Sequence, residues 1–170
     1  MRRKLTWVLV IGAAAVGITA YAGNVFATPA TGFMGTTIAL GQFDDIDVFN
    51  QSFPPGFLRP WISIQKTKGP SDLYIQSNVW AVRGSTGWHT HPGHSLIILT
   101  AGTVTAYEGD DPLCTPHSYT AGMTLVDPGD GRVHLIRNEG AIQATGFAVQ
   151  LIPAGAARRI DAPGNPSCGF

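Results

Sequence analysis

Two histidines separated by one residue, His89 and His91, have the residue type and spacing that best suit metal chemistry in this sequence. Residues i and i+2 of an extended strand point to the same face, so both imidazoles would be directed into one space. A third histidine, His94, follows in the same turn, before an apolar run over residues 96–99. The spacing predicts a pair of metal-ligating imidazoles on a β scaffold. A histidine-rich surface turn is the alternative interpretation.

Short extended segments separated by turns surround these histidines and would have to position them. Glycine (21 residues) and proline (12 residues) are frequent, and no convincing helix follows residue 27. The residue patterns predict strands at 36–40, 61–64, 73–82, 96–100, 103–107, 123–126, 134–137 and 142–152. Residues 153–170, rich in proline, glycine and alanine, are expected to run across the surface. This organisation is typical of an all-β sandwich or barrel.

The length and charge of the chain limit the partners that we expect. Its 170 residues suit a single domain with a sizeable core. Charged residues make up 13% of the chain and the formal net charge is zero. Nucleic-acid binding usually requires a basic stripe, and the sequence contains none. A nucleic-acid partner is therefore not expected.

The N-terminal segment has the organisation of an export signal. A basic stretch, residues 2–4, precedes the uncharged apolar residues 5–22, and Val25-Phe26-Ala27 fits the small-x-small rule for signal peptidase. We expect a signal peptide over residues 1–27 with cleavage after Ala27, leaving one domain over residues 28–170; cleavage after Ala22 is the earlier option. An uncleaved segment would instead anchor the protein in a membrane. Either outcome places the domain outside the cytoplasm, secreted or in the cell envelope.

The two cysteines, Cys114 and Cys168, support this location. An even number of cysteines in an exported chain suggests a disulfide. The bond would tie the C-terminal tail to the loop after the first histidine cluster. The separation of the two residues excludes a Cys-x-x-Cys redox or zinc motif. We therefore predict a Cys114–Cys168 disulfide, with two free thiols as the alternative.

A second segment, residues 122–138, forms a two-part pattern with residues 84–102. In the first part, His89-Thr90-His91 is followed by three residues, Ser95, six further residues and a glycine. The second part contains, in order, Gly122, Pro128, Gly131, His134 and Asn138. The two parts, in this order, resemble the two sequence motifs of the cupin superfamily. The resemblance implies an all-β fold, the double-stranded β-helix or jelly-roll barrel of the cupins, in a single domain.

The sequence departs from the cupin pattern at three places. The spacer between Gly84 and His89 is one residue short, and the segment from Pro128 to His134 is one residue long. Both lie in turns, where insertions are well tolerated. Ser95 stands where cupins usually have a glutamate, and serine is a poor metal ligand. The metal ligands that the resemblance implies are His89, His91 and His134, with His94 as an additional candidate.

Such a site would hold a divalent transition metal, because neutral imidazoles bind Zn, Fe, Mn, Ni or Cu. Three neutral ligands leave the full charge on the metal, which favours a small anionic molecule as the exogenous ligand or substrate. One hypothesis is a metal-dependent enzyme of the oxygenase or isomerase type. The other is a metal- or ligand-binding protein, or a structural one, without turnover. Because cupins often pair through sheet edges, the resemblance also implies a homodimer.

Overall fold

The computed structural model describes residues 28–170, and the predicted signal peptide, residues 1–27, lies outside the described residues. Within residues 28–170 the chain forms strands and turns and no helix, so the all-β prediction is confirmed. None of the described residues belongs to a helix that could cross a membrane. The strands are β1 (Thr31–Phe43), β2 (Asp47–Ser52), β3 (Trp61–Lys66), β4 (Ser71–Ser85), β5 (His89–Thr90), β6 (Ser95–Ala101), β7 (Thr103–Glu108), β8 (His117–Thr120), β9 (Thr124–Asp127), β10 (His134–Arg137), β11 (Ala144–Pro153) and β12 (Ile160–Asp161).

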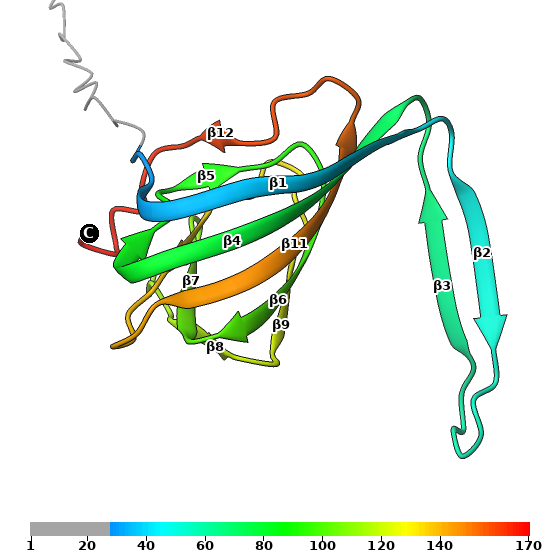
Figure 1. Ribbon diagram of the computed structural model, residues 1–170, viewed down its shortest axis with the longest axis horizontal. Helices are drawn as coiled ribbons and strands as arrows, with labels where there is room; N and C mark the ends of the chain where they lie inside the picture. Colours follow the sequence, from blue (N-terminus) through cyan, green and yellow to red (C-terminus); the bar gives the residue numbers. More distant parts are fainter. Residues whose placement is uncertain (1–27) are drawn as a thin grey trace, which may run out of the picture.

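Ten of these strands form one antiparallel sheet that curls into a barrel (Figure 1). The order along the sheet is β12-β5-β10-β4-β11-β6-β9. Strand β1 pairs with β4, and β7 pairs with both β10 and β8. The long strand β4 therefore contacts three neighbours, because β1, β11 and β10 all pair with it. Most neighbours in this sheet are far apart in sequence, as in a jelly roll.

The predicted strands correspond to β1, β3, β4, β6, β7, β9, β10 and β11. The bounds of β10 agree at both ends, whereas β1 is much longer than the predicted 36–40. Four strands were not predicted: β2, β5, β8 and β12. Of these, β5 and β12 are two residues long and exist because each pairs with an existing neighbour. Such short ladders have no sequence periodicity of their own.

The alternation of side chains along β6 defines the interior of the barrel. Ser95, Ile97 and Leu99 are buried inside, whereas Leu96 and Ile98 are exposed outside, as the pleat of a strand requires. The inward apolar residues belong to the main core cluster, made of Trp80, Ile97, Leu99, Val104, Ala106, Ile136, Ala144 and Ala148. This cluster fills part of the barrel and leaves a cavity beside it.

A second, smaller core lies where the C-terminal tail returns to the barrel. The predicted Cys114–Cys168 disulfide is confirmed, with the two Cα atoms 5.1 Å apart. Both cysteines pack against the buried residues Trp88, Tyr107 and Leu135. Trp88, next to His89 in the sequence, is 0% exposed and is therefore a core residue. The disulfide thus fastens the tail beside the segment that contains the histidines.

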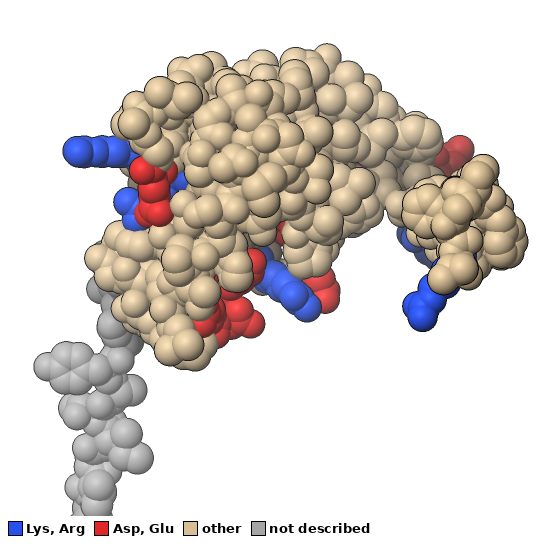
Figure 2. All heavy atoms as spheres, turned by 90° about the horizontal axis from the view of Figure 1, so that it is seen from below, with Lys and Arg blue, Asp and Glu red and all other residues tan. Residues whose placement is uncertain are grey.

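Strands β2 and β3 form a hairpin that projects from the barrel (Figure 1). We call residues 47–66 the hairpin arm. Its strands pair only with each other among the described residues. Apolar side chains on it remain in solvent, with Phe49 64% and Ile64 71% exposed. In Figure 2 the arm stands apart from the barrel, and charged side chains are few on the face shown.

Candidate metal centre

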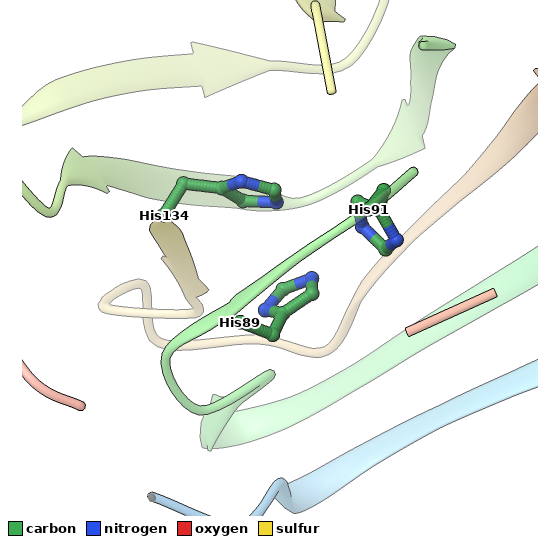
Figure 3. Close-up of side chains that lie close together, drawn as sticks. All are labelled: His89, His91 and His134. Carbon is green, nitrogen blue, oxygen red and sulfur yellow. The ribbon is translucent and has the colours of Figure 1, made fainter. Parts of the chain in front are cut away.

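Three of the predicted ligands meet in the barrel (Figure 3). His89 begins β5, His91 follows that strand directly, and His134 begins β10. Strands β5 and β10 are antiparallel neighbours, and His89 is paired in register with His134. The potential ligand nitrogens of the three rings lie within 4.8 Å of one another. The two sequence motifs thus supply side chains to one place, as the His-x-His spacing indicated.

A strained turn fixes the direction of the first imidazole. Gly87 has a φ of 68°, and a Cβ at this position would collide with the carbonyl oxygen of Thr28, so only glycine fits here. The carbonyl oxygen of Gly87 lies 2.8 Å from Nδ1 of His89. Because a carbonyl oxygen only accepts hydrogen bonds, the proton of this ring is on Nδ1. Nε2 of His89 is therefore available as a ligand.

A similar contact orients His91. Its Nδ1 makes a short hydrogen bond to the carbonyl oxygen of Arg158, in the segment before β12. The proton of the ring is again on Nδ1, because a carbonyl oxygen can only accept it. Backbone carbonyls that hold one nitrogen of a histidine are common behind metal ligands, since they fix both the tautomer and the ring orientation. His89 and His91 share this arrangement.

The rings of His89 and His134 are held in the neutral form that metal binding requires. Burial, and to a smaller extent the nearby His134 and Arg159, lower the pKa of His89 to about 2. Burial also lowers the pKa of His134, although the neighbouring carboxylate of Asp127 acts in the opposite direction. Neutral imidazoles offer a lone pair to a metal without first releasing a proton. The donor set therefore fits a divalent transition metal.

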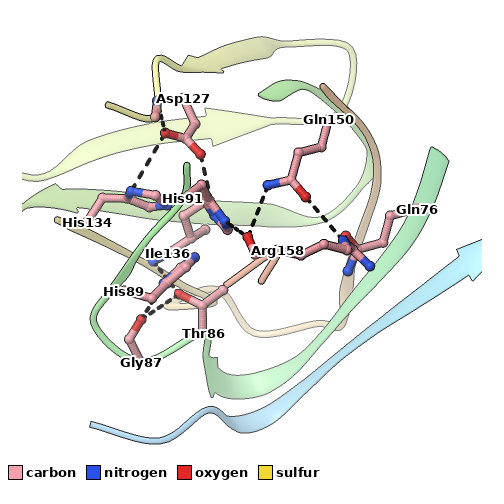
Figure 4. Close-up of polar contacts among 11 residues, drawn as sticks. Gln76, Thr86, Gly87, His89, His91, Asp127, His134, Ile136, Gln150 and Arg158 are labelled. Carbon is pink, nitrogen blue, oxygen red and sulfur yellow. Dashed lines mark hydrogen bonds and ion pairs between the residues drawn. The ribbon is translucent and has the colours of Figure 1, made fainter. Parts of the chain in front are cut away.

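A cavity of about 260 Å³ opens beside the three histidines. Its lining combines apolar core residues with polar ones, and the polar residues other than histidine are Gln76, Asn78, Thr86, Ser95, Gln150, Arg158 and Arg159. Nε of Arg158 donates to Gln150 (3.1 Å), and another guanidinium nitrogen donates to Gln76 (Figure 4). These contacts hold a positive charge at the wall of the cavity that the imidazoles also line.

One residue of the second motif, Asn138, has a structural role around this site. Asn138, which is fully buried, donates hydrogen bonds to the carbonyl oxygens of Trp80 (3.0 Å) and Ile142 (2.8 Å). Its own side-chain oxygen accepts from the backbone N–H of Gly140 (3.0 Å). All its hydrogen-bonding groups are used in this way, so Asn138 fixes the chain after β10 and with it the position of His134.

The fourth candidate, His94, lies elsewhere. It lines an outer groove together with Leu96 and Val149, whereas Ser95 faces the cavity with the histidines. This is the consequence of strand alternation, because neighbouring residues on β6 point to opposite sides. The structure therefore brings His89, His91 and His134 together and leaves His94 outside.

Sequence reasoning missed Arg158, Gln150 and Asp127, which all lie at the site. Arg158 belongs to the tail expected to run across the surface, and Gln150 is a polar residue on the inner face of a predicted strand. Asp127 comes directly after the predicted strand 123–126 and is the last residue of β9 in the structure. The available signal was the placement of polar residues at inward positions, and this becomes visible only once the strand faces are known.

No protein-family model and no curated protein matches the sequence. Among solved structures, the chain is similar to a polyketide cyclase from Streptomyces resistomycificus, at 15% identity and a TM-score of 0.51 over 85% of both chains. It is also similar to a cupin-like protein from Thermotoga maritima (17% identity, TM-score 0.47, 54% of this chain and 65% of that one). A third is a cupin superfamily protein from Desulfitobacterium hafniense (19% identity, TM-score 0.41, 47% and 67%). The likeness to the cyclase concerns the fold alone, and with the antiparallel barrel it confirms the predicted all-β jelly-roll fold.

Proposed function

We propose that this protein is a metal-binding cupin in which His89, His91 and His134 hold one divalent transition metal. The observation that supports this most directly is the convergence of three oriented imidazoles, with ligand nitrogens within 4.8 Å of one another, beside a cavity. Zn, Fe, Mn, Ni and Cu all accept such ligands. A metal bound here would supply Lewis-acid chemistry or, for iron or copper, redox chemistry.

The molecule that we propose to enter the cavity is small and anionic. A volume of about 260 Å³ is below the usual range for sites that bind drug-sized ligands, so a compact molecule is favoured. The lining includes Arg158 and Arg159, and neutral imidazoles leave the metal with its full positive charge. A carboxylate or an enolate would find both a cation and guanidinium donors in this cavity.

Two roles remain for the site, and the cavity favours ligand exchange. A structural metal is usually enclosed by protein ligands, whereas a catalytic or ligand-binding metal keeps open positions. The cavity beside the three histidines provides room for an exogenous group. We therefore place an enzyme of the oxygenase or isomerase type first and a non-enzymatic binding protein second.

Elemental analysis of the protein, purified without a metal-affinity tag, tests the metal site. We expect close to one transition-metal ion per chain in the wild type and none in the His89→Ala/His134→Ala double variant. His117→Ala, an exposed histidine on β8, is the matched control and should keep the metal. Absence of metal from the wild type, even after reloading, would overturn the proposal. If iron, copper or nickel is found, oxygen-uptake assays with small carboxylates separate the enzyme from the binding protein.

We infer that the domain functions outside the cytoplasm. The Cys114–Cys168 disulfide supports this location, because such bonds persist in oxidising compartments. The export signal that we propose occupies residues 1–27, with cleavage after Ala27. N-terminal sequencing of the protein from the periplasm or medium of an expressing bacterium tests both points. Recovery of the chain in the cytoplasm with an intact N-terminus would contradict them.

We propose a second copy of this chain as the macromolecular partner. The hairpin arm is uncovered, and an isolated two-stranded hairpin is marginally stable in water. The outer face of β6 and β11 is also apolar and exposed, with Leu96, Ile98, Phe147 and Val149 in solvent. A groove that Ile46 and Leu96 both line joins the root of the arm to this face.

The arm and the outer face are two uncovered apolar surfaces of one chain. Two copies can therefore cover each other's surfaces in a symmetric exchange. After the proposed cleavage the domain has 8 basic and 11 acidic residues, and this small negative net charge adds little long-range repulsion between the copies at physiological salt.

A further inference from the structure

One buried carboxylate lies against two of the three histidines, His91 and His134, without belonging to the group predicted from the sequence. Asp127, the last residue of β9, is 4% exposed. Its Oδ2 is 3.4 Å from Nε2 of His91, and its Oδ1 is 3.9 Å from Nδ1 of His134 (Figure 4). Asp127 is also the cross-strand partner of Ser95, which faces the same cavity. Directly opposed residues lie close together, so β9 can place a carboxylate where β6 has only a hydroxyl.

The turn after β9 holds this carboxylate in one orientation. The backbone N–H of Gly129 donates to Oδ1 of Asp127 at 2.9 Å. Gly129 has a φ of 68°, and a Cβ there would collide with the carbonyl group of Gly93, so the turn requires glycine at this position. With Oδ1 fixed by the backbone, the second oxygen has a defined position next to His91.

That second oxygen has no hydrogen-bond partner among residues 28–170, although it is fully buried. A buried carboxylate oxygen without a donor or a cation is costly, and native structures contain few of them. The nearest nitrogen does not solve the problem. In the neutral form of His91 that binds a metal, with its proton on Nδ1, Nε2 presents a lone pair toward Oδ2 and donates nothing to it. Two electron-donating atoms therefore face each other at 3.4 Å.

A cation between the two atoms would satisfy both. Ligand atoms about 2.1 Å from one tetrahedral metal are separated by about 3.4 Å. The distance between Oδ2 of Asp127 and Nε2 of His91 matches this separation. We propose that Asp127 is a fourth protein ligand of the metal, bound through Oδ2, and that the exogenous anion takes a fifth position on the side of the cavity. This inference rests on the proposed function, because it requires the metal held by His89, His91 and His134.

A carboxylate ligand changes the chemistry expected of the site. It contributes one negative charge, so the net charge of the metal with its protein ligands falls from +2 to +1. An oxygen donor also improves the fit to manganese and iron relative to an all-imidazole set, because these metals accept mixed nitrogen and oxygen ligands well. We therefore expect the identity of the bound metal to depend on Asp127.

Binding of Co²⁺ to the full, tag-free protein tests the inference, because the visible absorption of Co²⁺ reports its ligands. We expect Asp127→Asn to weaken Co²⁺ binding by at least tenfold and to change the absorption spectrum. Asparagine keeps an acceptor for the N–H of Gly129, so the turn can be retained. Asp72→Asn is the matched control, since Asp72 is a buried carboxylate that binds Gln42 and Gly155 away from the histidines. This variant should leave affinity and spectrum unchanged.

The outcomes separate the two proposals. If the wild type binds no Co²⁺, the proposed metal site itself fails. If the wild type binds Co²⁺, His134→Ala abolishes binding and a folded Asp127→Asn retains both affinity and spectrum, the metal site stands and Asp127 is not a ligand.

If Asp127→Asn does not fold, infrared difference spectra of the wild type decide the question. A shift of a carboxylate stretching band when Co²⁺ is added supports coordination by Asp127. The absence of any carboxylate shift overturns it.

Discussion

Strands β6 and β11 have buried polar residues on their inward face beside the cavity and exposed apolar residues on their outward face, and both are unusual for a soluble barrel. Beside the cavity, the inward side presents the polar groups of Ser95 and Gln150. On the outward side of the same strands, Leu96, Phe147 and Val149 are in solvent. Burial of polar groups is unfavourable unless they are hydrogen-bonded, and exposure of apolar groups is unfavourable unless they become covered. The two faces therefore require two different explanations.

The difference between the two faces indicates that each has a binding partner of a different kind. Inside, the polar groups are fixed by contacts such as those of Arg158 with Gln76 and Gln150, which is the preorganisation that a bound metal and an anion require. Outside, the apolar side chains and the hairpin arm have no cover among residues 28–170. We therefore propose a small ligand as the partner of the first face and a second copy of the chain as the partner of the second.

Removal of the hairpin arm should have the largest effect on the oligomeric state, because it deletes one of the two uncovered apolar surfaces. The N–H of Thr67 donates to the carbonyl of Ile46 at 2.8 Å, so a short Gly-Ser-Gly linker can join these residues in place of residues 47–66. We expect the full chain to be a dimer by light scattering and the shortened chain to be a monomer. The melting temperature and the metal content of the barrel should be retained.

Two results would contradict this expectation. A full chain that is monomeric at micromolar concentration removes the case for a second copy, and its sedimentation with anionic lipid vesicles would assign the surface to a membrane instead. A shortened chain that remains a dimer would show that the arm is not needed. Leu96→Lys/Val149→Lys on the outer face then tests the sheet surface separately.

Loss of the disulfide should have the next largest effect, which is a decrease in the free energy of unfolding of the barrel. The bond joins residues separated by 54 positions, for which chain entropy gives a stabilisation of up to about 4 kcal/mol. We expect Cys114→Ser/Cys168→Ser to lower the free energy of unfolding by about that amount in urea titrations. Addition of reductant should lower the stability of the wild type to that of the variant. Two cysteines that alkylate without reductant would show that the bond does not form.

These two regions also show what the sequence could predict. The barrel strands follow regular alternation, so both ends of β10 were predicted correctly. The disulfide was predicted correctly because the chain has only two cysteines. The convergence of the three histidines was predicted in two steps, since His-x-His on a strand directs His89 and His91 to one side and the resemblance to the cupin motifs added His134. The hairpin arm was not identified as a projection, because its residues 47–52 and 61–66 alternate like those of a strand in a sheet.

The missed parts of the site have a common physical reason. Asp127, Gln150 and Arg158 come from three segments that meet only when β9, β11 and the tail are placed around the barrel. Nothing in the local sequence distinguishes Asp127 from an ordinary turn aspartate. Its burial and its cross-strand pairing with Ser95 are properties of the assembled sheet.

The pH dependence of stability sharpens the difference between buried and exposed histidines. The pKa of His89 falls to about 2 in the folded state, whereas an unfolded histidine titrates near 6.5. Below that value the unfolded chain binds a proton that folded His89 does not, so stability is lost as the pH falls. For metal-stripped protein we expect a loss of about 2 kcal/mol from this group between about pH 7.5 and about pH 5.

Urea titrations of chelator-treated protein at several pH values measure this loss. His89→Gln should reduce the pH dependence and leave the remainder that the lowered pKa of His134 produces in the same direction. His117→Gln, a change to an exposed histidine on β8, should not alter it. A stability that is flat over this range, or that rises as the pH falls, would show that the interior histidines are not held neutral.

The smallest effect that we expect is on the affinity of the cavity for anions, and it tests the role of one polar side chain on the interior face. Arg158 is fixed by Gln76 and Gln150 at the wall of the cavity, with its guanidinium carbon 4.5 Å from the centre of the Tyr74 ring. We expect Arg158→Gln to weaken the binding of acetate and malonate to the Co²⁺ protein by about tenfold, which is about 1.4 kcal/mol. The change in Co²⁺ absorption on addition of each anion measures the affinity.

Two variants separate charge from shape in this experiment. Arg158→Lys keeps the positive charge without the paired donors, so it should recover part of the affinity, and more for acetate than for malonate, which can use two donors at once. Arg59→Gln, on the exposed loop of the hairpin arm, should change nothing. If Arg158→Gln binds both anions as tightly as the wild type, the guanidinium serves only to hold Gln76 and Gln150. The polar interior would then be explained by the metal alone, without an anionic ligand beside it.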